Sequence, residues 1–91
     1  MLRLRPSPQP MIDPVITLYG GEGCHLCHQA RDLILPLLPP GWRLREVDVR
    51  ADAELQARYG LRIPVMAVGE REKGWPFTAG QVRRLLEGNE G

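Results

Sequence analysis

Apolar residues change their spacing along this chain, and each spacing predicts a different kind of element. The run Val15–Tyr19 is β-branched and aromatic and lies between Pro14 and Gly20, so it predicts a short buried strand. Residues 29–38 predict a helix, because apolar positions recur there at helical spacing. Its apolar stripe consists of Cys27, Ala30, Ile34 and Leu37. The fold therefore begins with a strand followed by a helix.

The middle of the chain predicts a second strand and a short second helix. Three prolines and a glycine end the first helix, and residues 42–49 then alternate imperfectly between apolar and polar. Asp52 offers an N-cap to a short helix that contains Leu55 and Tyr59. We expect Gly60 to end this helix in the left-handed conformation.

The last third of the chain predicts a hairpin and a clearly marked helix. We expect a third strand at Val65–Val68, a polar turn at 69–73 and a short edge strand at 74–77, where a proline is tolerated. Thr78 and Gln81 form a capping box at the start of the last helix. Its apolar stripe consists of Val82, Leu85 and Leu86, and Gly88 ends it.

The elements follow the order strand, helix, strand, helix, strand, strand, helix (βαβαββα). A helical crossover makes the first two strands parallel, and the short turn makes the last two antiparallel. We therefore predict an α/β fold with a four-stranded mixed sheet and helices packed on it. The 91 residues suffice for one domain, which we place at residues 14–91. Residues 1–13 contain three prolines and predict a flexible tail, in which Met11 is a second candidate start.

The charge of the chain does not alter the predicted fold, but it excludes one class of partner. Lysine and arginine total 12 against 11 aspartate and glutamate, and the basic residues are scattered, so we expect no nucleic-acid partner. The N-terminal segment lacks the apolar run of a signal peptide, and no apolar stretch is long enough to cross a bilayer. We therefore expect a monomeric, cytoplasmic protein without a membrane partner.

The candidate chemistry lies between the first strand and the first helix, in Gly20–His28, which holds both cysteines. Cys24 comes at the strand-to-helix junction, where unpaired N–H groups and the positive end of the helix dipole favour a thiolate. Two intervening residues bring Cys27 back over the same turn, within reach of a disulfide. From position alone we assign Cys24 as the attacking thiol and Cys27 as the resolving thiol. His25, when protonated, would stabilise the Cys24 thiolate, although a solvent-facing histidine without a role fits the position equally well.

This arrangement resembles the thioredoxin fold in its minimal, glutaredoxin-like form. The resemblance rests on the Cys-x-x-Cys motif after the first strand and on Ile63-Pro64 at the start of the third, and it spans residues 14–88. The segment Gly23–His28 is most similar to small bacterial glutaredoxin-like proteins catalogued as a domain of unknown function.

The resemblance implies a thiol-disulfide oxidoreductase in which Cys24 attacks, Cys27 resolves and Pro64 is a cis-proline that faces the pair. Ile63 and Pro64 would line a groove for the extended main chain of a substrate or of glutathione. The implied partners are a disulfide-containing protein or glutathione, and a reductase or dithiol donor. Glutathione would act as a co-substrate, with no cofactor bound to the protein.

Two segments depart from the glutaredoxin pattern. Between the cysteines stand His25 and Leu26, where glutaredoxins usually have a proline and an aromatic residue. Residues 75–80 replace the Gly-Gly pair and aspartate that grip the glutathione carboxylate. The helix start at Thr78 offers free N–H groups that could still bind an anion.

The same cysteines also fit other functions. A redox-inactive binding module of this fold would use the groove without turnover. A metal or iron–sulfur carrier would use Cys24 and Cys27, but the chain lacks the second ligand pair of a structural zinc site, so we assign no metal ligand. Cys-x-x-Cys-His also matches covalent haem attachment, which the preceding strand and the missing export signal disfavour. For Asp48 we favour a surface or capping role over that of a proton acceptor for Cys27.

Overall fold

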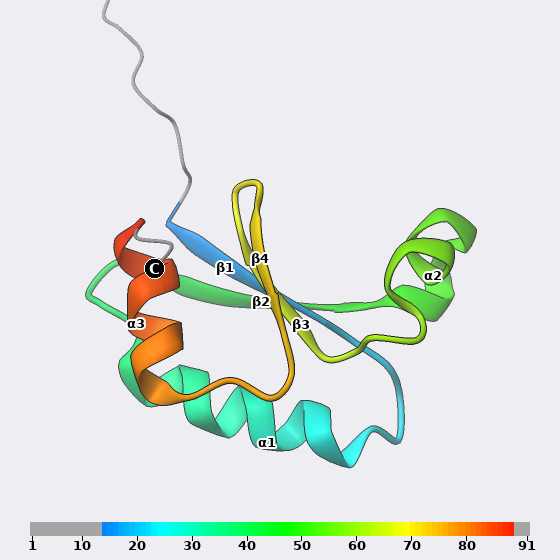
Figure 1. The fold of residues 1–91 in the computed structure, drawn as a ribbon, viewed down its shortest axis with the longest axis horizontal. Coiled ribbons are helices and arrows are strands. Elements are labelled where there is room, and N and C mark those ends of the chain that lie inside the picture. The colour runs from blue at the N-terminus through cyan, green and yellow to red at the C-terminus, as the bar shows by residue number, and fades with distance from the viewer. Residues whose placement is uncertain (1–13, 89–91) are drawn as a thin grey trace, which may run out of the picture.

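A computed structural model of the chain describes residues 14–88 (Figure 1). Its elements are β1 (Val15–Gly20), α1 (His25–Ile34), η1 (Leu35–Leu37), β2 (Arg43–Asp48), η2 (Val49–Ala51), α2 (Ala53–Tyr59), β3 (Val65–Val68), β4 (Arg71–Gly74) and α3 (Ala79–Glu87), where η marks a 3₁₀ turn. The flexible tail and the second start at Met11 that the sequence predicts lie outside the described residues.

The four strands form one mixed sheet in the order β2-β1-β3-β4. β1 pairs in parallel with β2, as the helical crossover requires, and β3 is antiparallel to both β1 and β4. The predicted α/β fold with a four-stranded mixed sheet is confirmed. Among the described residues, no helix is long and apolar enough to cross a membrane.

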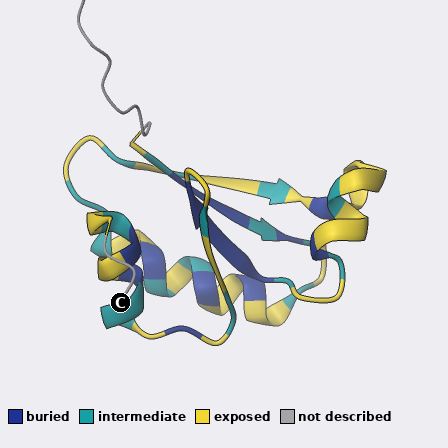
Figure 2. Cartoon of the chain, turned by 45° about the horizontal axis from the view of Figure 1, so that its top comes forward, coloured by how far each residue is buried: buried dark blue, intermediate teal, exposed yellow. Residues whose placement is uncertain are grey.

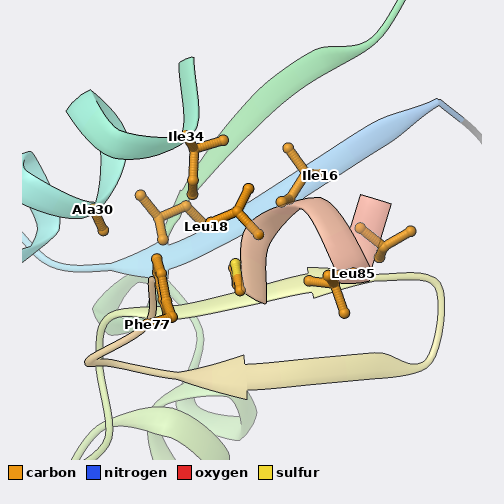
Figure 3. Close-up of a cluster of buried hydrophobic side chains, with 9 residues drawn as sticks. Ile16, Leu18, Ala30, Ile34, Phe77 and Leu85 are labelled. Atoms are coloured by element: carbon orange, nitrogen blue, oxygen red, sulfur yellow. The ribbon is translucent and has the colours of Figure 1, made fainter. Parts of the chain in front are cut away.

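The main core lies between the sheet and the two longer helices, α1 and α3, which cover the same face of it (Figures 1 and 2). Alternate residues of β1 and β3 point into this core, as the two-residue period of a strand requires. It consists of Ile16, Leu18, Ala30, Ile34, Met66, Val68, Phe77, Val82 and Leu85 (Figure 3). Burial of these side chains fixes the orientation of α1 on the sheet, and with it the position of Cys24.

A second, smaller cluster holds α2 against the end of the sheet. It joins Val49, Tyr59 and Val65, with Tyr19, Leu55 and Ile63 packed around them. Figure 1 shows α2 at the same end of the sheet as the start of α1. The segment between α2 and β3 therefore passes close to the loop that leads to the cysteines.

The predicted hairpin is present, but the predicted bounds of its turn and second strand were wrong. We expected a turn at 69–73 and a strand at 74–77, whereas β4 is Arg71–Gly74 and pairs Val68 with Arg71. A tight turn suffices to connect the strands, because Gly69 adopts a positive φ of 60°. The sequence does not predict β4, because its side chains are charged and an edge strand needs no alternation of apolar and polar residues.

Two helix ends also differ from the prediction. The first helix ends at Ile34 and continues as the 3₁₀ turn η1, because Pro36 has no N–H to continue α-helical pairing. Gly60 has φ −55°, so the expected left-handed end of α2 is wrong. The capping box of Thr78 and Gln81 and the left-handed end at Gly88 are confirmed.

Candidate functional site

The site is built on the start of α1, where Cys24 is the N-cap residue. Cys24 and Cys27 form a disulfide with a Cα–Cα distance of 5.2 Å. The Cys24 sulfur also accepts a hydrogen bond of 3.1 Å from the Cys27 backbone N–H. In the dithiol form this N–H, the following amides and the helix dipole all favour negative charge on Cys24.

The two sulfurs differ in their access to solvent. Cys27 is 6% exposed, whereas Cys24 is half-buried. The Cys24 sulfur is therefore the more accessible of the two. The attacking role of Cys24 and the resolving role of Cys27 stay predictions.

Gly20, the last residue of β1, lies directly against the buried sulfur. A Cβ added to Gly20 would come within 2.7 Å of Cys27 Sγ and 3.3 Å of Cys27 Cβ. Only glycine leaves room for the backbone to approach the disulfide this closely. The bend in the chain that brings Cys24 to the helix start therefore depends on a residue without a side chain.

Pro64 directly precedes β3. The antiparallel ladder of β1 and β3 ends at the pair Tyr19–Val65, so Gly20 and Pro64 follow that pair at the same end of the sheet. The Ile63–Pro64 peptide bond is cis, and the Pro64 carbonyl accepts a hydrogen bond of 2.9 Å from the Trp75 N–H. The Trp75–Pro76 bond is also cis, which the sequence analysis did not foresee.

Ile63 and its neighbours form the rim of the site. A Cβ placed on Gly21 would be 3.3 Å from Ile63 Cδ1, so the Ile63 side chain lies against the loop that precedes Cys24. Leu26, between the cysteines, is 43% exposed, and Leu61 is fully exposed at 103%. One exposed leucine thus lies between the cysteines, and the other lies two positions before Ile63.

A pocket of about 250 Å³ opens on the β2 side of Cys27. Its polar walls are carboxylates and one imidazole, contributed by Glu22, Glu46, Asp48 and His28. Asp48 caps η2 by accepting a hydrogen bond of 2.9 Å from the Arg50 N–H and pairs with the Arg50 guanidinium at 3.5 Å. The capping role favoured from the sequence is therefore present, and the same carboxylate also borders the space beside Cys27.

His25 and Thr78 are placed differently from the rest of the predicted site. His25 is the exposed first residue of α1, and no hydrogen bond or ion pair joins its imidazole to another residue of the range 14–88. Thr78 caps α3, with its N–H and its hydroxyl both engaged by Gln81. Figure 1 shows the start of α3 beside the C-terminal half of α1, away from the start of α1. The substrate role of Thr78 and the electrostatic role of His25 stay predictions.

Tyr59 is the titratable residue that sequence reasoning missed. It is 3% exposed, stacks on Tyr19 with ring centroids 4.3 Å apart, and donates its hydroxyl proton to the Glu72 carboxylate. Burial raises the pKa of Tyr59 to about 12, and the hydrogen bond and negative charge of Glu72 contribute to the increase. Because Glu72 is 13 positions away along the chain, no local pattern could reveal this contact.

We expect this pKa to be visible as a late tyrosine titration. Below pH 10 the Tyr59 hydroxyl is protonated in both folded and unfolded chains, so its contribution to stability is complete. As pH rises from about 10 to about 12, only the unfolded chain ionises freely, and that contribution is lost. Ultraviolet absorbance of tyrosinate should show a step near pH 12 that Tyr59→Phe removes. A late step that survives in this variant would contradict the assignment.

Within residues 14–88, no three His, Cys, Asp or Glu side chains gather in a way that could hold a metal ion.

Comparison with known proteins gives the family. A model of the glutaredoxin-like domain (DUF836) matches residues 15–87. The chain belongs to this glutaredoxin-like family. The match covers every strand and helix described above, including the Cys24–Cys27 pair and the Ile63–Pro64 bond. No curated protein matches the chain.

Two solved structures resemble the glutaredoxin-like domain. The structural genomics target protein XcR50 from X. campestris has 37% sequence identity and a TM-score of 0.69, over 82% of this chain and 99% of that one. A mutant thioredoxin from Halobacterium salinarum has 19% identity and a TM-score of 0.64, over 85% of this chain and 74% of that one. The second likeness shows the thioredoxin fold alone.

Proposed function

We propose that this glutaredoxin-like domain is a thiol-disulfide oxidoreductase. The observation that carries the proposal is the pair of sulfurs at disulfide distance, with Cys24 accessible at the helix N-cap and Cys27 buried behind it. This asymmetry suits a reaction in which one thiol meets the substrate and the other closes the cycle.

The reaction starts from the dithiol form. The Cys24 thiolate attacks one sulfur of a substrate disulfide, the substrate S–S bond breaks, and the departing thiolate takes a proton from water. Cys27 then loses its proton to water in the pocket bordered by Asp48 and Glu46, and its thiolate attacks Cys24 Sγ. The second substrate thiol leaves, so the substrate gains two electrons and the cysteine pair becomes a disulfide. Two molecules of glutathione, which leave as glutathione disulfide, or one dithiol donor restore the Cys24–Cys27 dithiol by the reverse steps.

A polypeptide substrate is supported by the rim of the site. The backbone N–H and C=O of Ile63 take part in no hydrogen bond within residues 14–88, so they can pair with an extended chain. The exposed Leu26 and Leu61 offer apolar contacts on the bordering segments. An extended protein chain with a disulfide would use the Ile63 backbone and both leucines together.

The proposal is tested by the reduction potential of the cysteine pair. The purified protein is equilibrated in glutathione redox buffers, and free thiols are trapped and counted by mass. A reversible two-electron couple between about −270 and −120 mV would support an oxidoreductase and give its preferred direction. A pair that does not oxidise reversibly would contradict it and favour a binding module or a metal carrier.

We expect Leu61 to discriminate between protein and small disulfides. In Leu61→Ser the KM for a protein disulfide should rise roughly three- to tenfold, because an apolar contact is lost, while a small synthetic disulfide is reduced as before. Leu35→Ser is the matched control, since Leu35 is also exposed (47%) but lies in η1, beyond the C-terminal end of α1. Equal effects of the two substitutions, or equal effects on the two substrates, would contradict a role for Leu61 in substrate contact.

A further inference from the structure

One carboxylate on the edge strand contacts both ends of the segment that leads to the substrate rim. Glu72 lies on β4, opposite Ala67 of β3. It accepts the hydrogen bond from the Tyr59 hydroxyl and forms an ion pair with the Arg62 guanidinium at 3.8 Å. Tyr59 is the last residue of α2, and Arg62 immediately precedes Ile63. The turn between them is therefore fixed to the sheet at both ends by the same side chain.

The turn has few other attachments. Two backbone bonds join it to α2: the Gly60 N–H donates to the Gln56 carbonyl at 2.8 Å, and the Arg62 N–H donates to the Tyr59 carbonyl at 2.8 Å. Leu61 contacts solvent only, and Gly60 contributes no side chain. Since neither residue packs on the sheet, the position of this turn depends on the side chains at its ends.

The aromatic ring of Tyr59 adds to the same attachment. The guanidinium carbons of Arg62 and Arg58 lie 5.4 and 5.7 Å from its centroid, within the range of a cation–π contact. Tyr19, at the end of β1, stacks on the ring with an interplanar angle of 15°. Tyr59 thus joins β1, β4 and the turn, and its hydroxyl selects one orientation of the turn relative to β4.

We infer that Glu72 is a positioning residue of the substrate groove, which through Tyr59 and Arg62 holds Ile63 and Pro64 in register with the cysteine pair. The inference rests on the proposed function for its catalytic consequence, whereas the positioning itself is a property of the fold. Glu72 and Arg62 are both partly exposed, so their ion pair contributes little to overall stability. The contacts are better suited to orienting the turn, because a charged hydrogen bond is strongly directional.

The positioning is tested by amide hydrogen exchange in Glu72→Ala and Tyr59→Phe. The Arg62 N–H donates to the Tyr59 carbonyl, and its exchange should accelerate about tenfold, since a hydrogen bond to a charged group is lost, while exchange at Met66 and Val68 in β3 is unchanged. Glu72→Gln still accepts the Tyr59 hydroxyl and should give a smaller effect. A role in stability alone would accelerate the β3 amides equally, and that result would overturn the inference.

Matched controls and kinetics complete the test. Tyr19→Phe removes a hydroxyl that makes no hydrogen bond within residues 14–88 but keeps the ring that stacks on Tyr59, and Glu70→Ala removes an exposed carboxylate from the turn before β4; neither should change exchange at Arg62. With a protein disulfide, Glu72→Ala should raise KM about tenfold and leave kcat and the reduction potential unchanged. An unchanged KM in an active enzyme would overturn the groove role. If the wild-type protein reduces no disulfide, the proposed function fails, and the exchange data still decide whether Glu72 positions the turn.

Discussion

Replacing Cys24 with serine should abolish disulfide turnover and leave the fold intact. A serine hydroxyl is not ionised at neutral pH, so the N–H group and helix dipole that favour a thiolate at this N-cap have no nucleophile to activate. Serine is a good N-cap residue and should keep the hydrogen bond to the Cys27 N–H, so α1 should not unfold. Reduction of a protein disulfide in the presence of a dithiol donor, with circular dichroism as the check on folding, measures the effect.

Cys27→Ser separates the attack on the substrate disulfide from the resolution of the mixed disulfide. Cys24 can still attack in this variant, but the mixed disulfide cannot be resolved from within the protein. We expect a trapped covalent adduct with the substrate, visible by mass spectrometry, and no such adduct with Cys24→Ser. An adduct formed through Cys27 in the Cys24→Ser variant would reverse the assignment of the two thiols.

Local sequence signals were sufficient for most of the fold and for the centre of the site. The apolar periods of β1 and α1 and the capping box of Thr78 depend on residues a few positions apart, so they are legible in the chain itself. Cys24 was placed at a helix start for the same reason, and the structure makes it the N-cap. The order of elements then determined the mixed sheet, since a helical crossover and a tight turn each allow one strand direction.

The wrong and missing predictions concern features that depend on contacts with residues elsewhere in the chain. The charged strand β4 forms because Val68 and its neighbours in β3 supply its hydrogen-bonding partners. Arg71–Gly74 has no alternation of apolar and polar residues from which a strand could be predicted. Gly60 ends α2 without a positive φ because the Arg62 N–H closes a further turn on Tyr59. The contact between Tyr59 and Glu72 joins α2 to β4 and depends on the same register.

At the thiol site, too, position along the chain predicted one feature, and tertiary packing determines another. Position along the chain suggested which cysteine attacks, but the burial of Cys27 depends on how closely β1 approaches α1. Gly20 controls that approach, because its backbone lies against the Cys27 sulfur. In the sequence Gly20 is only a residue that bounds a strand, and nothing beside it points to the sulfur seven positions later.

Gly20→Ala should therefore destabilise the protein and make its disulfide easier to reduce. The new methyl group would lie 2.7 Å from Cys27 Sγ, closer than real Cβ contacts allow, so either β1 or the sulfur must shift. Such overpacking costs roughly 1–3 kcal/mol in the free energy of unfolding. In the dithiol form the Cys27 side chain can rotate away from the methyl group, whereas the disulfide holds it in place. The oxidised form is thus destabilised more, and the reduction potential should rise by about 30 mV for each tenfold loss in the stability of the disulfide.

Thermal unfolding and titration in glutathione redox buffers measure the two effects of Gly20→Ala. Gly74→Ala is the matched control, since Gly74 also ends a strand of the sheet, and a Cβ added there has no heavy atom within 4 Å. We expect Gly74→Ala to leave the reduction potential unchanged and to alter the unfolding temperature little, because no contact is forced. If both substitutions lower stability equally and neither changes the potential, the close approach of Gly20 is a matter of strand packing alone. A rise in potential confined to Gly20→Ala would mean that the absence of a side chain at this one position helps to set how readily the Cys24–Cys27 pair gives up its electrons.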